Sequence, residues 1–305
     1  MDIYLPIAEV SVNAAVIVAM GLLVGFLSGM FGVGGGFLTT PLLIFYGIPP
    51  AVAVASSATQ ITGASVSGAL AHWRRGGVDP KMGAVLIAGG LCGASVGSIL
   101  FRLLQTSGQI DIVISLIYVV LLGSVGGLML KDAVAGLLAK RAGRASQPRA
   151  HRHNRFVAAL PGRTRFYKSG LYMSPLAPFL LGLFVGVLTV IMGVGGGFIM
   201  VPAMIYLLGM QAGVVIGTSL MQIVAITAAT TVLHAVNTKS VDIVLAVLLL
   251  AGGVIGAQFG ANAAQKLPAE KLRLALALLV LAVAVRLFIG LTWRPGDLYS
   301  VQGPA

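Results

Sequence analysis

The chain has 305 residues, of which 58% are hydrophobic and 9% charged, and its mean hydropathy is +1.00. A soluble domain carries about 25% charged residues, so this composition excludes a soluble enzyme, a disordered chain and a nucleic-acid-binding domain. The net charge of +12 is concentrated in one stretch, because the residues from Lys131 to Lys168 hold ten Lys and Arg and a single acid, Asp132.

A transmembrane helix needs about 20 mainly apolar residues. Eight apolar stretches of about that length are predicted to be helices, at residues 10–30, 52–72, 82–104, 110–130, 175–192, 214–235, 241–264 and 272–291. The first lacks a basic flank, so we expect a retained helix and not a signal peptide. Two further apolar segments, 37–47 and 198–209, are about half as long as a crossing requires. The sequence leaves open whether they cross or re-enter.

The second half of the chain repeats the first. The segment FGVGGGFLTTPLLIFYG at 31–47 matches MGVGGGFIMVPAMIYLLG at 192–209. Further matched pairs are Ser57 with Ser219, Gln60 with Gln222, His72 with His234, Asp79 with Asp242, and the glycine runs at 89–97 and 252–260. Two related halves in one membrane chain are a common plan of transporters. We therefore predict an all-α polytopic membrane protein with repeats at 1–135 and 173–305, joined by a basic linker at 136–172.

The distribution of Lys and Arg predicts the orientation, because cytoplasmic loops are enriched in these residues. The basic region 131–170 and the loops 73–81 and 265–273 are expected in the cytoplasm. With the N-terminus outside, each half then crosses an odd number of times and the halves are inverted. The alternative is four crossings per half in parallel, which places three basic residues of 265–273 outside.

The two GVGGG clusters are predicted to break their helices, since each interior glycine costs about 1 kcal/mol relative to alanine. The short helix after each break begins with unpaired N–H groups that carry a partial positive charge. Two such helix starts could converge on one anion. The candidate ligand residues are Gly32, Gly34, Gly35, Gly36, Gly193, Gly195, Gly196 and Gly197. Close helix packing is the alternative use of glycine, and we assign the runs at 89–97 and 252–260 to it.

Polar side chains inside apolar stretches extend the candidate anion site. They are Ser57 and Gln60 in the first half, and Thr218, Ser219 and Gln222 in the second. Hydroxyl and amide groups can donate to an oxyanion without carrying charge, although hydrogen bonding between helices is the competing use. His72 and His234 end equivalent segments, where each could move a proton or face lipid headgroups.

The acidic residues argue against a cation substrate, because none of the eight lies deep in an apolar stretch and cation carriers often keep a carboxylate there. No metal-ligand cluster and no nucleophile or acid–base motif is visible in the sequence. We therefore expect neither a cofactor nor a metal, and no enzyme activity.

The duplicated GxGGGF…P motif, followed in each half by a Ser-x-x-Gln helix, resembles the TauE/SafE family of sulfite exporter-like membrane transporters over about residues 10–292. The positions that match are the eight glycines named above with Pro41 and Pro202. The resemblance implies a permease of the bacterial inner membrane that moves a small anion such as sulfite or an organosulfonate, in the direction of export. An anion channel built on the same breaks, or a membrane scaffold that recruits partners through the linker, remains as an alternative.

Overall fold

The computed structural model describes residues 2–31, 35–141, 164–210, 212–264 and 269–292. The first half contains helices α1 (Ala14–Phe31), α2 (Gly36–Phe45), α3 (Pro50–Arg74), α4 (Pro80–Thr106) and α5 (Ile110–Arg141). The second contains α7 (Leu176–Met192), α8 (Gly197–Tyr206), α9 (Ala212–Leu233), the π-helical turn η1 (His234–Thr238), α10 (Ile243–Ala264) and α11 (Ala269–Thr292). The predicted all-α polytopic class is confirmed.

Five stretches in the described residues are long and apolar enough to cross a membrane, and they belong to α4, α5, the α9–η1 segment, α10 and α11. Helix α3 has 25 residues, enough for a crossing, but its Ser and Thr residues lower its hydropathy. Helices α2 and α8 have ten residues each and extend about 15 Å, half of the hydrocarbon thickness. Neither can cross the membrane alone.

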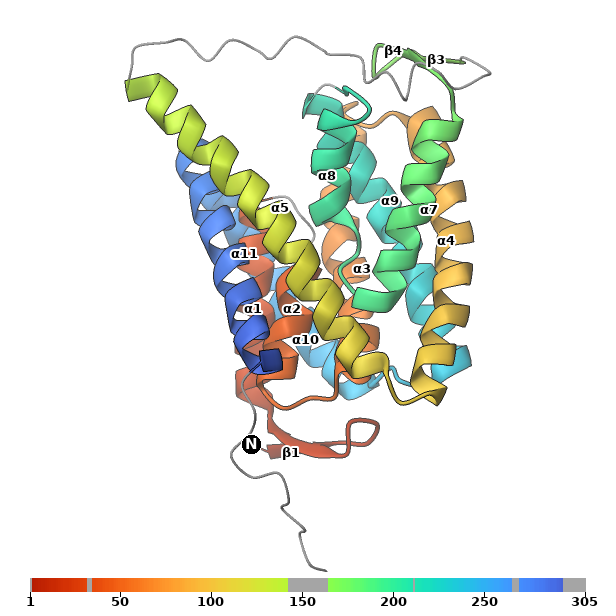
Figure 1. Ribbon diagram of the computed structural model, residues 1–305, viewed down its shortest axis with the longest axis vertical. Coiled ribbons are helices and arrows are strands. Elements are labelled where there is room, and N and C mark those ends of the chain that lie inside the picture. Colours follow the sequence, from red (N-terminus) through yellow and green to blue (C-terminus); the bar gives the residue numbers. More distant parts are fainter. Residues whose placement is uncertain (1, 32–34, 142–163, 211, 265–268, 293–305) are drawn as a thin grey trace, which may run out of the picture.

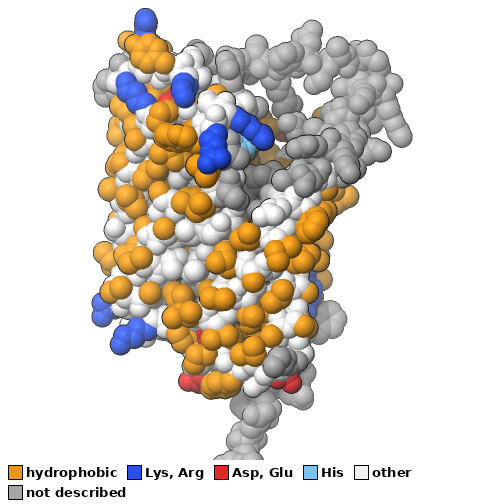
Figure 2. All heavy atoms as spheres, turned by 180° about the vertical axis from the view of Figure 1, so that it is seen from behind, with side chains coloured by type: hydrophobic (Ala, Val, Ile, Leu, Met, Phe, Trp, Pro, Cys, Tyr) orange, Lys and Arg blue, Asp and Glu red, His pale blue; other side chains and the backbone are white. Residues whose placement is uncertain are grey.

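The surface has the composition expected for contact with lipid. Apolar side chains are spread over the whole height of the face in Figure 2, whereas Lys and Arg lie toward the ends of the molecule. Large exposed side chains such as Ile99, Leu103 and Val120 lie on α4 and α5. Because lipid hydrocarbon and not water surrounds such a surface in a membrane, exposing apolar side chains there carries no free-energy penalty.

Two short β-hairpins are additions to the predicted fold. Strands β1 (Asp2–Leu5) and β2 (Val10–Asn13) pair before α1, and β3 (Thr164–Phe166) and β4 (Leu171–Met173) pair before α7. The first predicted helix therefore starts at Ala14, because alternating Val and Ser residues form β2. Helix α5 continues to Arg141, so the linker predicted from residue 136 begins within this helix. Residues 142–163, the rest of its basic core, lie outside the described residues.

The helices of the two halves pack against each other in matched pairs. Helix α1 packs on α10 and α4 packs on α7, and α1 and α7 occupy equivalent places in the repeat, as do α4 and α10. Glycines make both contacts close: a β-carbon on Gly93 would meet the Leu183 carbonyl oxygen, and one on Gly256 would meet that of Leu22. The glycine runs at 89–97 and 252–260 thus serve helix packing.

Helices α3 and α9 cross in the interior through a polar seam. Thr59 pairs with Thr231 at 3.3 Å and Thr62 with Thr227 at 2.8 Å between hydroxyl oxygens. Residue numbers rise along α3 as they fall along α9, so these repeat-related helices are antiparallel. Figure 1 shows the two hairpins at opposite ends of the molecule. An internal two-fold relation between the halves would produce this arrangement.

We predict that Gly93→Ala and Gly256→Ala each lower the melting temperature of the detergent-purified protein. The added methyl group would press on a helix backbone, and overpacking costs about 1–3 kcal/mol. Gly127→Ala on α5 is the control, because nothing lies within 4 Å of its β-carbon position and alanine favours a helix. A melting temperature that is equal in all three variants would contradict this packing role.

Candidate functional site

The second glycine cluster interrupts the path of the chain between two helices. Helix α7 ends at Met192 and α8 begins at Gly197. Gly193, Gly195 and Gly196 between them have φ angles of 68°, 72° and 75°, a left-handed conformation that glycine adopts without steric cost. The segment is buried in protein, which satisfies the requirement that non-helical backbone at membrane depth be kept from lipid.

The first glycine cluster is described in part. Gly32 and Gly34, both candidate ligand residues, lie outside the described residues. Gly35 precedes α2 with a φ angle of 67°, and Gly36 is the first residue of that helix. Gly35 and Gly36 are buried, so α2 begins inside the protein, as α8 does.

The two clusters meet each other. A β-carbon on Gly36 would lie 2.8 Å from the carbonyl oxygen of Val194 and 2.9 Å from that of Gly193. One residue farther on, the rings of Phe37 and Phe198 stack with their centroids 5.0 Å apart and an interplanar angle of 18°. Phe37 and Phe198 are repeat partners, so the starts of α2 and α8 touch through equivalent residues.

Backbone groups of opposite partial charge, N–H and C=O, come together where the two helix starts meet. The first backbone hydrogen bonds of α8 are donated by Ile199 and Met200 to the Gly196 oxygen, and no acceptor in the described residues is paired with the N–H groups of Gly197 and Phe198. The start of a helix carries a partial positive charge. The carbonyl groups of Gly193 and Val194 stand against α2 as partial negative charges, so an anion must compete with them there.

The polar residues predicted on α3 are hydrogen-bonded to hydroxyl groups of α2. The Thr39 hydroxyl donates to Gln60 Oε1 at 2.9 Å, and that of Thr40 donates to Ser57 Oγ at 3.1 Å. Ser57 in turn donates to the Ala53 carbonyl oxygen at 2.6 Å. The structure therefore brings Ser57 and Gln60 beside the first turns of α2, in a network whose oxygen atoms already have partners within the protein.

The second half lacks the corresponding network. The repeat partners of Thr39 and Thr40 are Met200 and Val201, which have no hydroxyl groups. As a consequence, Gln222 is 1% exposed and its Oε1 has no hydrogen-bond partner in the described structure. Ser219 bonds within its own helix, to the Ile216 oxygen.

Thr218 has a different place from the other candidates. Its hydroxyl donates to the Val214 oxygen and accepts from the backbone N–H of Asp79 at 3.0 Å. It therefore joins α9 to the N-terminus of α4. The structure does not bring Thr218 into the network around Ser57 and Gln60.

Tyr118 on α5 is a residue that sequence reasoning missed. Its side chain is fully buried, and its hydroxyl donates to the Met192 carbonyl oxygen at 2.6 Å, where α7 stops. Its hydroxyl also lies beside the Thr40 side chain of α2. A lone tyrosine inside the apolar stretch 110–130 was the available signal, since a buried tyrosine hydroxyl needs a partner.

His72 and His234 have unlike surroundings, although they are repeat partners. His72 is partly buried near the end of α3. His234 is buried, its Nε2 lies 3.0 Å from the Val190 oxygen, and its Nδ1 lies 3.2 Å from the Thr238 hydroxyl. Because a carbonyl oxygen only accepts, Nε2 carries the proton. His234 therefore caps the end of α7 in this conformation, and proton transfer by either histidine stays a prediction.

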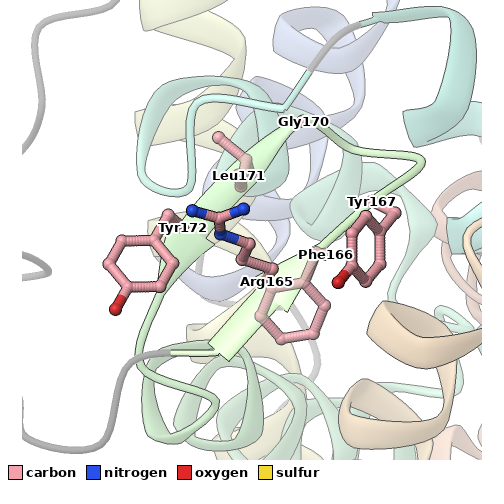
Figure 3. Close-up of a pocket in the computed structure, with 6 residues that line it drawn as sticks. All are labelled: Arg165, Phe166, Tyr167, Gly170, Leu171 and Tyr172. Atoms are coloured by element: carbon pink, nitrogen blue, oxygen red, sulfur yellow. The ribbon is translucent and has the colours of Figure 1, made fainter.

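A separate surface pocket of about 400 Å³ lies at the β3–β4 hairpin (Figure 3). Its lining comprises Arg165, Phe166, Tyr167, Gly170, Leu171 and Tyr172. The guanidinium group of Arg165 lies 5.8 Å from the centre of the Tyr172 ring. The pocket is open and none of the predicted site residues lines it.

Comparison with known proteins gives one consistent result. The family model for the sulfite exporter TauE/SafE matches residues 17–287. The probable membrane transporter protein YjnA of Bacillus subtilis is 28% identical over 271 residues, which cover 89% of this chain and 98% of that protein. A probable membrane transporter protein of Xylella fastidiosa is 30% identical over 274 residues, covering 88% and 93%. No solved structure matches.

We predict that Tyr118→Phe lowers the free energy of unfolding by about 1–3 kcal/mol, the cost of leaving a buried carbonyl group unpaired. Thermal or denaturant unfolding in detergent measures the change. Tyr167→Phe is the matched control, because Tyr167 is 83% exposed. If Tyr118→Phe were as stable as the control, Tyr118 would not stabilise the end of α7.

Proposed function

We propose, since this chain belongs to the sulfite exporter TauE/SafE family of membrane transporters, that it is a secondary transporter of a small anion. The substrate would be sulfite or an organosulfonate, and the direction would be export across the bacterial inner membrane. The substrate class and direction come from the family description. The place of binding comes from the arrangement of the helix breaks.

The contact between the two glycine clusters carries this proposal. Helices α2 and α8 both begin inside the protein, and their first residues meet at the Phe37–Phe198 pair. An anion between the two starts would receive backbone N–H donors from both. Gly36 and Gly195 have no side chains of their own, and the Ile61 side chain, which packs against both, must move before a ligand can reach the backbone there.

The site as described is closed around itself. The carbonyl groups of Gly193 and Val194 approach Gly36, and Ser57 and Gln60 are paired with α2. For the anion to enter, these groups must separate, and the donors released from Thr39 and Thr40 would then turn to it. Binding would therefore be coupled to movement of one half against the other, which is how transporters with inverted repeats work.

Electrostatics at the breaks suits a small anion. The charged side chains that are buried in the described part of the chain, Asp79 and Asp242, precede α4 and α10 and do not lie at the breaks. No fixed negative charge would repel the substrate there. An anion that leaves a negative-inside cell gains about 2.3 kcal/mol per charge per 100 mV, so the membrane potential alone could drive export.

The topology completes the proposal. We propose two inverted repeats, at 1–135 and 173–305, with the linker 136–172 in the cytoplasm. The matched contacts of α1 with α10 and of α4 with α7 support the inversion, as do the hairpins at opposite ends (Figure 1). The β3–β4 end, which joins the basic linker, would then face the cytoplasm.

We predict that Gln222→Leu abolishes transport without loss of stability. Replacing an unpaired buried polar group by an apolar one is neutral or stabilising, whereas a ligand contact would be lost. The matched variant Gln60→Leu removes the hydrogen bond that Gln60 accepts from Thr39. It should therefore lower both transport and stability. Sulfite, sulfonates and carboxylates are tested by counterflow in liposomes and by thermal stabilisation in detergent.

Each outcome of this experiment bears on the proposal. Saturable counterflow of a sulfur oxyanion that Gln222→Leu abolishes supports the carrier. Single-channel currents would favour the anion channel instead. If no sulfur oxyanion moves or stabilises the protein, the substrate class is wrong, and full transport by Gln222→Leu would remove this residue from the site.

A further inference from the structure

A buried carboxylate fastens the β3–β4 hairpin to the opposite half of the molecule. Asp79 precedes α4, is 2% exposed, and accepts hydrogen bonds with Oδ1 from the backbone N–H groups of Lys81 and Met82. Its Oδ2 accepts from the N–H and the hydroxyl of Ser169, at 3.0 and 2.6 Å. Ser169 lies in the turn between β3 and β4, so one oxygen caps the helix and the other holds the hairpin.

The same device recurs with the halves exchanged. Asp242 precedes α10 and is fully buried; its Oδ1 accepts from the N–H of Leu245 at 3.1 Å. Its Oδ2 accepts from the N–H of Ile7, in the turn between β1 and β2, at 3.1 Å. The turns that hold Ile7 and Ser169 are equivalent in the repeat. The two aspartates therefore hold matching hairpins at the two ends of the molecule.

Each aspartate also binds the opposite half through its own backbone. The N–H of Asp79 donates to Thr218 on α9, and that of Asp242 donates to Ser56 on α3, at 3.0 and 3.1 Å. Thr218 and Ser56 are again repeat partners. Apart from the bonds within α4 and α10 and at their caps, the hydrogen bonds of Asp79 and Asp242 in the described residues thus cross from one half to the other.

The hairpins cover the apolar ends of the interface between the halves. Leu5 and Val12 of the first hairpin are buried and pack with Leu43, Leu245 and Leu249.

Phe166 and Met173 of the second hairpin are also buried and pack with Met82, Leu86 and Met204. One hairpin thus lies over the ends of α2 and α10, and the other over the ends of α8 and α4.

We propose that Asp79 and Asp242 are positioning residues of the transport cycle, and that the hairpins they hold are its two gates. Opening the pathway at one end requires the halves to part there, and these bonds must then break. The described conformation has both hairpins fastened, so it is closed at both ends. This inference rests on the proposed transport between two halves, but not on the identity of the substrate.

The two gates are not equally strong. Ser169 adds a hydroxyl hydrogen bond to Asp79, which Ile7 cannot supply to Asp242. Lys81 Nζ also bonds to the carbonyl oxygen of Arg165 in β3, at 3.3 Å. The β1–β2 gate therefore has fewer bonds to break and should open more readily in the protein without substrate.

The experiment uses Asp→Asn variants because asparagine also caps helices. The asparagine side chain keeps an oxygen that accepts from the helix N–H groups. Its NH2 group, however, would face the donors of Ser169 or Ile7, so the hydrogen bond to the hairpin turn would lose its acceptor. Asp79→Asn and Asp242→Asn thus weaken one gate each and spare the helix. Accessibility is measured without substrate, by the rate at which a maleimide labels a cysteine placed at a buried position of each hairpin in the full-length protein.

The reporters are Val12→Cys and Met173→Cys, equivalent buried positions in β2 and β4, in a Cys92→Ala background. We expect Asp79→Asn to raise the labelling rate at position 173 about tenfold and to leave the rate at position 12 unchanged. Asp242→Asn should do the reverse. A tenfold change in rate corresponds to about 1.4 kcal/mol. With both aspartates intact, the labelling rate should be higher at position 12 than at position 173. Ser169→Ala should reduce the difference between the two rates, because it removes a hydrogen bond that holds the β3–β4 hairpin.

The outcomes separate the gates from general loosening and from the proposed function. Equal increases at both positions would indicate general destabilisation and overturn the proposal, as would unchanged rates at both. If Asp79→Asn unfolds, Ser169→Ala replaces it, because this change removes one hydrogen bond to Asp79 and should raise labelling at 173 alone. Because labelling needs no ligand, one-sided effects would support the gates even if sulfite proved not to be the substrate.

Discussion

A helix that stops inside a membrane protein must have its free backbone groups paired or covered, since lipid offers no hydrogen bonds. The structure meets this constraint at the end of α7 with side chains from distant segments. Tyr118 of α5 bonds to the Met192 oxygen and His234 to the Val190 oxygen, while Gly193 turns the chain. With these carbonyl groups satisfied, α8 can begin in the interior and present its N-terminus to the start of α2.

The duplicated architecture and the differences between its halves have separate roles. Repetition explains the paired helix contacts, the Phe37–Phe198 stack and the two aspartate junctions. The differences explain two of the unpaired buried atoms in the described residues: Gln222 lacks a partner for its Oε1 because Met200 stands where the first half has Thr39. Ser65 is likewise unpaired, since the partner of its equivalent Thr227 is Thr62, whose counterpart is Val224. Beside the two helix starts, a substrate would therefore meet Ser57 and Gln60 of the first half already hydrogen-bonded to α2, and Gln222 of the second half with its Oε1 unpaired.

Much of the fold could be predicted from the sequence because membrane helices are specified by local composition. Apolar length located the helices, and four glycines in five residues predicted interruptions after Phe31 and Met192. The hairpins were not predictable in this way, because three or four residues such as Thr164–Phe166 carry no clear periodicity and depend on packing beneath them. Tyr118 and the junctions of Asp79 and Asp242 were missed for a related reason: their partners lie 74 to 235 residues away in the chain, and no local pattern reveals them.

The central claim is that the facing starts of α2 and α8 bind the transported anion. The most direct measurement is the anomalous X-ray scattering of selenite, a heavier analogue of sulfite, in crystals of the purified protein. The account predicts a selenium peak between the two helix starts, near Gly36 and Gly197. A peak confined to the Arg165 pocket, with none at the helix starts under saturating selenite, would contradict it.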